Sequence, residues 1–192
     1  GVLLWEIESF SEQFFTQSGG VFMKILAHAL LDLEEREQWY AEGGSVRHQQ
    51  AWLMGRFCLK EAARNWIFQQ TGELLYPSEI IIRHNDAGAP YLDGWWNGPM
   101  IQAPEVSLTH DRYRAIAAIS EAGQFVGIDV ERIGRLQKPE HVVESFTAKE
   151  RVLVGNLAGA ELQEAILRIW CAKEAAAKYY GIGLQGEPAL FE

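Results

Sequence analysis

The sequence repeats one helical pattern, and this repeat narrows the possible folds. Residues 57–63 read Phe-Cys-Leu-Lys-Glu-Ala-Ala, and residues 170–176 read Trp-Cys-Ala-Lys-Glu-Ala-Ala. Alanine, lysine and glutamate are strong helix formers and no proline interrupts either stretch, so both predict helices. Upstream of each, at nearly the same offset, residues 32–35 and 147–150 carry a cap residue followed three positions later by glutamate, which marks a helix start. The repetition indicates two similar units.

Two similar units predict a particular architecture. We expect an α+β chain, similar to an α/β sandwich, with two subdomains related by a pseudo-two-fold axis and residues 1–123 and 124–192 as the two halves. Each half would pack a small antiparallel sheet on a long helix. A ligand would bind in the cleft between the halves, where small-molecule sites are common. With 192 residues, of which 48% are hydrophobic, the chain is long enough to build this core as a monomer with internal symmetry.

Hydrophobic periodicity and turn residues assign the individual elements. The longest prediction is a helix over residues 46–70, ended by Gly72, and a second long helix covers residues 161–180. Short helices are expected after Asp32 and Thr147. Strands are expected at residues 21–31, 79–83, 90–92, 106–109, 113–120 and 125–131, the last three as an antiparallel meander. The period of the first of these runs is also compatible with a helix.

Composition and charge argue against several classes of protein. The net charge of −9 argues against a nucleic-acid surface, and the sequence has no run of 18 apolar residues that would span a membrane. The acidic stretch at residues 5–12 lacks the layout of a secretory signal, so we expect a cytoplasmic location. The two cysteines, Cys58 and Cys171, are expected to be reduced, buried and not catalytic. Gly1 at the start is compatible with a tag remnant, removal of methionine, or a domain excised from a longer chain.

Two carboxylates near residue 130 are candidate metal ligands. Asp129 and Glu131 would share one face of the strand predicted at residues 125–131, because strand side chains alternate. The wet face of a half-buried strand is the ordinary explanation of this spacing. Together with Glu174 on the second long helix, the pair would instead form an oxygen-rich site that suits Mg²⁺. Without a cation, three neighbouring carboxylates would repel one another and take up protons.

A histidine and a basic helix stripe are candidate anion-binding groups. Arg56, Lys60 and Arg64 recur every four residues, so they share one stripe of the first long helix. Cations placed in this way weaken one another unless an anion binds them, so the stripe is either a phosphate clamp or a solvated face. His110 directly follows the strand predicted at residues 106–109 and is either a ligand or a local hydrogen-bonding partner.

Five short motifs, taken in order, resemble those of a known enzyme family. They lie at residues 88–92, 106–110, 127–131, 146–150 and 170–178. In this order and spacing they resemble the 4′-phosphopantetheinyl transferases of the two-repeat, surfactin-synthetase-activating type, over about residues 21 to 190. Two further stretches, residues 52–60 and 181–188, resemble transferase domains fused to the C-terminus of iterative polyketide synthases.

The resemblance implies a reaction and a partner. Members of the family bind coenzyme A between two halves and transfer its 4′-phosphopantetheine arm to a serine of an acyl or peptidyl carrier protein, releasing adenosine 3′,5′-bisphosphate. The carrier would be a separate protein or part of the same polypeptide. The N-terminal half would hold the adenosine phosphate, and the C-terminal half would hold the metal and the pyrophosphate.

The resemblance also implies metal-binding and catalytic residues. Asp129, Glu131 and Glu174 match the magnesium ligands of the family. Glu174, directly or through a metal-bound water, is expected to accept the proton of the serine. With Lys178 and His110, which match residues at the pyrophosphate of coenzyme A, Glu174 forms the expected catalytic group.

The same resemblance implies a set of positions that bind coenzyme A. Thr109, His110 and Lys178 belong to this set. Arg56 and Lys60 match basic positions of the first long helix near the adenosine phosphate.

Two positions depart from the family pattern. Ala89 stands where lysine is usual and cannot supply a phosphate contact, and Asp111 places an acid where serine is usual, near a site for anions.

Two other functions stay open. A coenzyme A-binding module without activity would keep the basic helix and tolerate loss of the acids. A Mg²⁺-dependent pyrophosphate hydrolase would use the same acids without any carrier protein.

Two surfaces are candidates for docking a carrier protein. One is the loop that contains Trp95 and Trp96, and the other is the basic cluster of Arg132, Arg135 and Lys138. Buried packing is the alternative explanation for the tryptophans, and a solvated loop is the alternative for the cluster.

Overall fold

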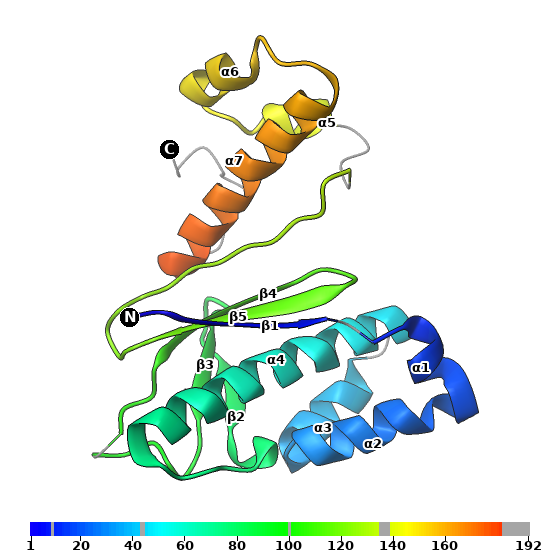
Figure 1. The fold of residues 1–192 in the computed structure, drawn as a ribbon, viewed down its shortest axis with the longest axis vertical. Coiled ribbons are helices and arrows are strands. Elements are labelled where there is room, and N and C mark those ends of the chain that lie inside the picture. Colours follow the sequence, from blue (N-terminus) through cyan, green and yellow to red (C-terminus); the bar gives the residue numbers. More distant parts are fainter. Residues whose placement is uncertain (9, 43–44, 100, 135–138, 182–192) are drawn as a thin grey trace.

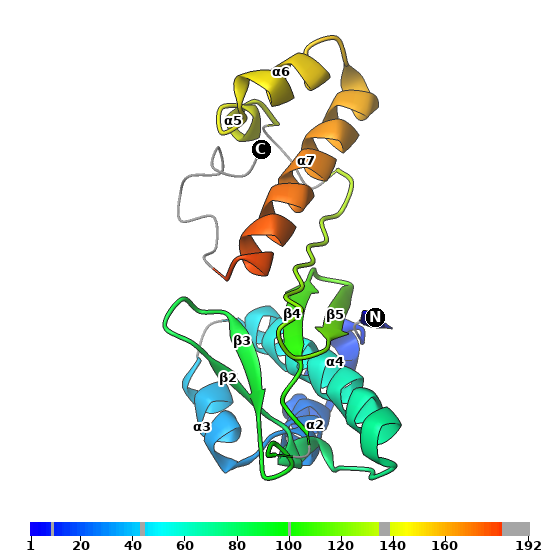
Figure 2. The ribbon, with the colours of Figure 1, turned by 90° about the vertical axis from the view of Figure 1, so that its left-hand side faces the viewer.

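The structure, a computed structural model, describes residues 1–8, 10–42, 45–99, 101–134 and 139–181. Its N-terminal part contains both sheets and the long helix α4 (Val46–Thr71). Its C-terminal part contains the helices α5 (Pro139–Val143), α6 (Ala148–Val154) and α7 (Gly159–Tyr179). An extended segment, residues 125–134, joins the parts and passes between the sheet and α7 (Figure 1, Figure 2). Within these residues, no helix is long and apolar enough to cross a membrane.

Helix α4 is the centre of the N-terminal part. Ser45 caps its start, because the serine side chain accepts a hydrogen bond from His48 N. Gly72 ends it in the left-handed conformation with a φ of 73°. The face that carries Cys58 and Ala62 is fully buried in the main hydrophobic core. The prediction of a long helix that ends at Gly72 is confirmed.

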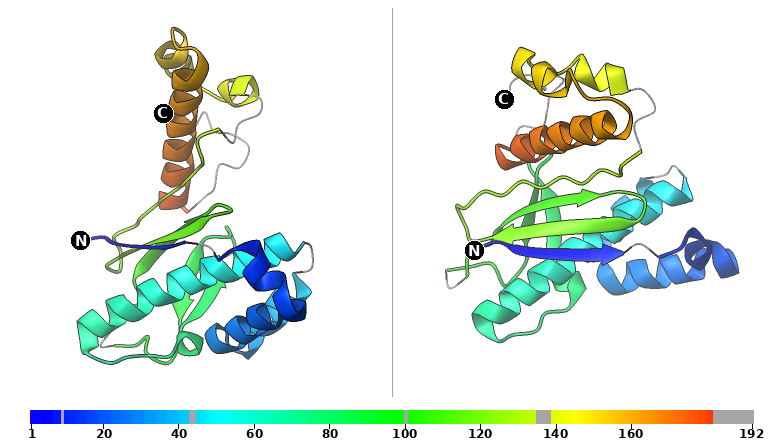
Figure 3. Two further views of the ribbon diagram at one scale, coloured as in Figure 1. Left: turned by 45° about the vertical axis from the view of Figure 1, so that its right-hand side comes forward. Right: turned by 45° about the horizontal axis from the view of Figure 1, so that its top comes forward.

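A three-stranded antiparallel sheet lies against α4 in the order β1–β5–β4 (Figure 3). β5 (Arg114–Ser120) pairs with β4 (Glu105–His110), which confirms the strands expected at residues 106–109 and 113–120. β1 (Leu3–Glu8), for which the sequence analysis made no prediction, pairs with the other edge of β5. Partly buried and exposed residues alternate along β1, as in a strand with one face on the core.

A hairpin of β2 (Ile81–His84) and β3 (Pro90–Asp93) forms the second sheet. It follows the short 3₁₀ helix η2 (Pro77–Glu79) and confirms the two extended stretches expected in this region. In its turn Gly88 has a φ of 82°, a conformation that favours glycine. The side chain of Asn85 accepts hydrogen bonds from the backbone of the same turn. This ordered turn is one wall of a cavity.

Residues 21–30 form the helix α2 (Val21–Leu30), so the prediction of a strand there is wrong. Met23, Ala27 and Leu30 are its buried residues, and their spacing places them on one helical face. This face packs in a core with α1 (Glu12–Thr16) and α3 (Leu33–Ala41), and the 3₁₀ helix η1 (Gln17–Gly20) precedes α2. The two polar residues of the run, Lys24 and His28, are four residues apart and exposed, so the sequence did contain a helical period that the strand prediction overlooked.

Residues 125–131 form no strand, so the prediction of a third meander strand is wrong. The segment runs beside β4 without a backbone ladder (Figure 3). Hydroxyl groups of β4 hold it instead, because Ser107 Oγ accepts a hydrogen bond from Ile128 N at 3.1 Å and Thr109 Oγ1 accepts one from Val130 N at 3.2 Å. These side chains accept the hydrogen bonds that backbone carbonyls would accept in a sheet, so the segment lies beside β4 without backbone pairing.

The C-terminal half has no strand among its described residues, 124–134 and 139–181. The small sheet that we expected in this half therefore has no counterpart in these ranges. Helices α5, α6 and α7 share a separate core that includes Phe146 and Ile166. The mixed fold of helices and small antiparallel sheets agrees with the predicted class, while the pseudo-two-fold relation and the boundary at residue 124 stay predictions.

The two matched stretches of sequence make the same buried interaction. In each half a short helix begins with a capping box, and the glutamate of that box pairs with a lysine inside the following long helix. Glu35 of α3 lies 2.5 Å from Lys60 of α4, and Glu150 of α6 lies 2.6 Å from Lys173 of α7. All four residues are buried. This equivalence supports a common origin of the two halves.

Glu150→Ala should destabilise the C-terminal half strongly. It removes the carboxylate beside the buried Lys173 ammonium, and breaking such a buried pair costs about 3–5 kcal/mol. Glu164→Ala is the matched control, because Glu164 pairs with Arg168 at 2.7 Å on the same helix but the Arg168 side chain is 78% exposed. Its loss should cost less than about 1 kcal/mol. Urea unfolding measures both variants, and equal losses would contradict the role given to the buried pair.

Candidate functional site

Asp129 is the point at which the extended segment is fixed between β4 and α7. Lys178, in the last turn of α7, donates hydrogen bonds to Asp129 Oδ1 at 2.8 Å and to Ile128 O at 3.1 Å. From β4, Thr109 Oγ1 donates to the same Asp129 oxygen at 3.0 Å. The structure therefore brings together three predicted site residues, Thr109, Asp129 and Lys178, from three separate elements.

A glycine sets how closely the segment approaches α7. A Cβ atom on Gly127 would lie 1.9 Å from Ala175 O and 2.6 Å from Tyr179 N. Both are backbone atoms of a helix, so neither can rotate away from an added side chain. Glycine is thus required at this contact, and the close approach brings Asp129 within reach of Lys178.

Asp129 and Glu131 place negative charge beside Glu174 and Cys171. Asp129 Oδ2 is buried and accepts no hydrogen bond from the described residues. Burial raises the pKa of Glu174, and the charges of Asp129 and Glu131 raise it further, although Lys178 opposes them. Burial and then the Asp129 carboxylate raise the pKa of Cys171 to about 12, so Cys171 is a neutral thiol at physiological pH.

The predicted magnesium ligands lie near one another without forming a ready coordination shell. No group of three or more His, Cys, Asp or Glu side chains in the described part of the chain is arranged to hold a metal ion. Asp129 Oδ2 is nevertheless a buried carboxylate oxygen without a partner there, and Mg²⁺ binds oxygen donors of this kind. Because Mg²⁺ keeps several waters, it needs few protein ligands. The carboxylates of Asp129, Glu131 and Glu174 are negatively charged oxygen donors, which is the kind of ligand that Mg²⁺ binds. The metal site itself stays a prediction.

A cavity of about 320 Å³, which we call the inner cavity, is lined by Lys178, the residue that is hydrogen-bonded to Asp129. Its walls come from α4, β4, the turn of the β2–β3 hairpin and the C-terminal end of α7. A volume of this size is within the range of small-molecule sites. Among the described residues that line it none is acidic, and the basic ones are Arg56, His84, His110 and Lys178. The inner cavity therefore favours an anionic ligand.

Arg56 reaches the inner cavity from α4 and is almost completely buried, with 5% of its surface exposed. Its guanidinium lies over the Trp52 ring, 3.8 Å from the ring centroid. Arg56 Nη1 is 3.5 Å from Glu35 Oε1, and Arg56 Nε has no hydrogen-bond partner in the described ranges. Arg56 thus lines the inner cavity with one buried donor that lacks a partner in these ranges, and its role at a phosphate stays a prediction.

Lys60 lies away from the inner cavity, although the sequence analysis expected it beside Arg56 at a phosphate. It is fully buried, and its ammonium donates to Glu35 Oε2 at 2.5 Å. Burial lowers the pKa of Lys60, and Glu35 raises it. Arg64, the third member of the stripe, pairs with Glu61 at 2.6 Å. Helical spacing correctly placed the three cations on one stripe, but of the three Arg56 alone lines the inner cavity, because α3 covers Lys60.

His110 lines two cavities at once, the inner cavity and a second, larger one. Its ring packs against α4 at a position without a side chain, because a Cβ on Gly55 would lie 3.3 Å from His110 Cδ2. Desolvation by the cavity walls lowers the pKa of His110, and the Lys178 ammonium adds to this effect. The imidazole is therefore neutral at pH 7 and can donate one hydrogen bond.

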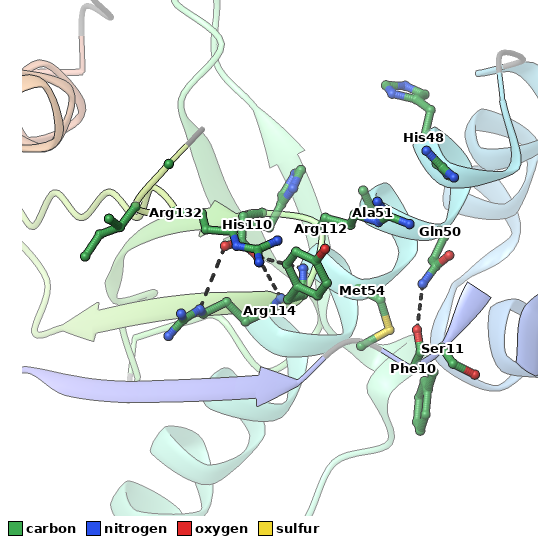
Figure 4. Close-up of a pocket in the computed structure, with 15 residues that line it drawn as sticks. Phe10, Ser11, His48, Gln50, Ala51, Met54, His110, Arg112, Arg114 and Arg132 are labelled. Atoms are coloured by element: carbon green, nitrogen blue, oxygen red, sulfur yellow. Dashed lines mark hydrogen bonds and ion pairs between the residues drawn. The ribbon is translucent and has the colours of Figure 1, made fainter. Parts of the chain in front are cut away.

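The larger cavity, which we call the outer cavity, has a volume of about 1050 Å³ (Figure 4). It lies between the first turns of α4 and the turn that joins β4 to β5. Phe10 and Met54 contribute apolar surface, and the guanidinium of Arg132 lies 4.6 Å from the centroid of Tyr113. The arginines that line it are Arg47, Arg112, Arg114 and Arg132. The outer cavity therefore presents a basic rim on a protein with a net charge of −9.

Asp111, which departs from the family pattern, stabilises the turn between β4 and β5. Its Oδ1 atom accepts hydrogen bonds from Tyr113 N at 2.6 Å and from Arg114 N at 3.0 Å. Aspartate commonly forms such a turn with the backbone that follows it. The carboxylate is thus engaged by the turn, which explains how an acid is tolerated beside a basic cavity.

The two predicted docking surfaces have different outcomes. Trp95 is 63% exposed, but Trp96 is 6% exposed and belongs to the main core. Arg132 lines the outer cavity, whereas Arg135 and Lys138 lie outside the described residues. Trp96 is therefore a core residue, and Trp95 and Arg132 stay candidates for a docking surface.

Three residues near Arg56 were missed by the sequence analysis. Glu35 was recognised only as part of a helix cap, although it also contacts Arg56. Trp52 precedes Arg56 by one helical turn, and this i, i+4 spacing was an available signal. His84 lines the inner cavity from the end of β2, and no sequence pattern marks it.

Comparison with known proteins gives a family match in the C-terminal half. A profile of the 4′-phosphopantetheinyl transferase superfamily (ACPS) matches residues 125–192. Among solved structures, the chain is similar to a holo-(acyl-carrier-protein) synthase from Bacillus anthracis strain Ames in complex with CoA (3′,5′-ADP), with 21% identity and a TM-score of 0.44. That match covers 62% of this chain and 92% of the synthase chain. No curated protein matches the sequence.

Gly127→Ala should damage the site without changing a predicted ligand-binding side chain. The added Cβ would meet Ala175 O at 1.9 Å, so the segment that carries Asp129 must move away from α7. Overpacking of this kind costs about 1–3 kcal/mol. Gly98→Ala is the control, because the space around Gly98 is open and its φ is not in the left-handed region. Thermal unfolding compares the two, and an unchanged melting temperature for Gly127→Ala would disprove the close contact with α7.

Proposed function

We propose that this protein transfers the 4′-phosphopantetheine arm of coenzyme A to a serine of an acyl or peptidyl carrier protein. The observation that carries the proposal is the convergence of His110 and Lys178 on the basic inner cavity, with Asp129 bonded to Lys178 at 2.8 Å. The match of residues 125–192 to the transferase superfamily supports the proposal independently.

The inner cavity would receive the adenosine bisphosphate end of coenzyme A. Residues 87–90 of the hairpin turn and the facing side of β4 offer two walls for the nucleoside. Arg56 and His84 supply positive charge or hydrogen-bond donors for a phosphate group. Since Ala89 has no charge to contribute, this chain would depend on Arg56 for that phosphate.

The pyrophosphate would lie between His110 and Lys178, where it gains two hydrogen-bond donors. Phosphoryl transfer depends chiefly on positioning and on neutralising charge, so such donors are effective catalysts. Mg²⁺, bound by Asp129, Glu131 and Glu174, would supply further neutralisation of the phosphate charge. The Lys178 ammonium lines the inner cavity and contacts Asp129, so it links the nucleotide and the acidic group.

The transfer is a substitution at phosphorus. The serine oxygen of the carrier attacks the phosphorus that bears the pantetheine arm, and the bond from that phosphorus to the bridging oxygen breaks. The electron pair of that bond leaves with adenosine 3′,5′-bisphosphate. Glu174 would accept the serine proton, while His110 and Lys178 would orient the phosphate oxygens.

The outer cavity is the proposed approach for the carrier protein. It shares His110 with the inner cavity, so a residue that enters it comes next to the proposed pyrophosphate site. Its arginines favour an acidic partner surface and would steer one toward the site. Arg132, a predicted docking residue, lines this cavity.

The finer features of the family assignment belong to the same proposal. The matching buried pairs of the two halves support a two-repeat, surfactin-synthetase-activating type with a pseudo-two-fold relation between residues 1–123 and 124–192. The relation to polyketide synthase domains rests on residues 52–60 and 181–188, of which 182–188 lie outside the described residues. A cytoplasmic monomer without nucleic-acid or membrane partners is proposed from composition.

Incubation with coenzyme A, Mg²⁺ and a panel of apo carrier proteins tests the proposal. The expected result is a gain in the intact mass of one carrier that equals the phosphopantetheine arm. Release of the arm without any carrier would favour the pyrophosphate hydrolase. Binding of coenzyme A without either product would favour the non-catalytic binding module.

Asp129→Ala and Glu174→Gln should each lower carrier modification by about 100-fold or more, because they remove a proposed metal ligand and the proposed proton acceptor. The circular dichroism spectrum should stay unchanged, since the hydrogen bonds from Ile128 N and Val130 N to β4 still hold the extended segment in both variants. Glu164→Gln is the control on the same helix, outside the lining of both cavities. Near-normal turnover by either site variant would remove the role given to that residue.

A further inference from the structure

The Nη1 edge of the Arg56 guanidinium has protein partners, whereas its Nε atom has none among the described residues. On one side, Nη1 lies 3.5 Å from Glu35 Oε1 and donates a long hydrogen bond to Ile82 O at 3.4 Å. The ring of Trp52 covers one face of the group. Nε, by contrast, is buried and has no hydrogen-bond partner among the described residues. A buried donor without a partner is costly, so it is expected to have one when a ligand is bound.

The carboxylate of Glu35 is held in place independently of Arg56, because other groups donate hydrogen bonds to both of its oxygens. Oε1 accepts a hydrogen bond from Ile82 N at 3.2 Å. Oε2 accepts from Asp32 N at 3.2 Å, within the capping box of α3, and from Lys60 Nζ at 2.5 Å. Glu35 therefore ties α3, α4 and β2 together, and its position sets where Arg56 can lie.

The charges around Glu35 leave the positive charge of Arg56 available to a ligand. Lys60, at 2.5 Å, is the closer counter-ion of Glu35, and Arg56 is at 3.5 Å. Burial lowers the pKa of Arg56, and Glu35 opposes this effect. Because the inner cavity has no acidic lining residue in the described ranges, an anion bound there would stabilise the guanidinium.

We infer that Glu35 and Trp52 are positioning residues that orient Arg56 to bind a phosphomonoester on the nucleoside of the substrate. The inference rests on the proposed function and adds to it the residues that determine specificity for that phosphate. A guanidinium binds phosphate through a planar fork, so its plane and its rotation within that plane must both be set. Trp52 restrains the guanidinium through the contact over its ring, 3.8 Å from the centroid, and Glu35 restrains the rotation from the Nη1 edge.

Calorimetric titration with coenzyme A and with 3′-dephospho-coenzyme A tests the inference. The variants are Trp52→Leu and the double variant Glu35→Gln, Lys60→Met, in which the buried lysine is removed together with its partner so that the fold is retained. In both, the affinity for coenzyme A should fall about tenfold or more, because a charged hydrogen bond is weakened. The affinity for the dephospho compound should change less than about threefold. Arg64→Met is the matched control, since Arg64 pairs with Glu61 and should leave both affinities unchanged.

Turnover at saturating coenzyme A should stay within about threefold of the wild type in these variants, while KM for coenzyme A rises, because the phosphate is remote from the reacting phosphorus. Equal losses for the two ligands, or no loss for either, would overturn the inference and leave carrier modification standing. Selective loss for coenzyme A, in a protein that modifies no carrier, would support the inference and contradict the transferase. A wild type that binds neither ligand would overturn both.

Discussion

A buried carboxylate–ammonium pair fastens each long helix to the short helix that precedes it. Burying either charge alone is costly, so Glu35 needs Lys60, and Glu150 needs Lys173. Since each glutamate also closes a capping box, the pair fixes the start of the short helix against the middle of the long one. In the N-terminal half this arrangement determines the surroundings of Arg56. In the C-terminal half it anchors the helix that carries the predicted catalytic residues.

The candidate site is built where the two halves meet, along one extended segment. β4 holds this segment through hydroxyl side chains, and α7 holds it through Lys178 and the close contact at Gly127. As a result Asp129 lies between donors from both halves, beside a cavity whose described lining is basic and apolar. Residues that are far apart in the sequence thus surround one cavity with basic side chains in its walls, which suits the anionic ligand of the proposed function.

Features set by local chemistry were predictable, and features set by packing were not. The capping boxes at residues 32–35 and 147–150 and the end of α4 at Gly72 depend on neighbouring backbone groups, so the sequence indicates them directly. The helix α2 was mistaken for a strand because its run is mostly apolar, although the spacing of Lys24 and His28 by four residues was a helical signal. Likewise, the spacing of Lys60 predicts its helix face, but its burial depends on α3, which no local pattern reveals. Among the candidate site residues, motifs indicated Asp129, His110 and Lys178 and helical spacing indicated Arg56, whereas Trp52 and Glu35 required the three-dimensional contacts.

The central claim is that coenzyme A binds in the inner cavity, between the hairpin turn and the end of α7. A crystal structure of the protein with coenzyme A and Mg²⁺ tests this claim most directly. The account predicts the nucleoside beside residues 87–90, a ribose phosphate on Arg56 and the pyrophosphate on Lys178. Coenzyme A bound instead in the outer cavity, with Lys178 still paired only with Asp129, would contradict it.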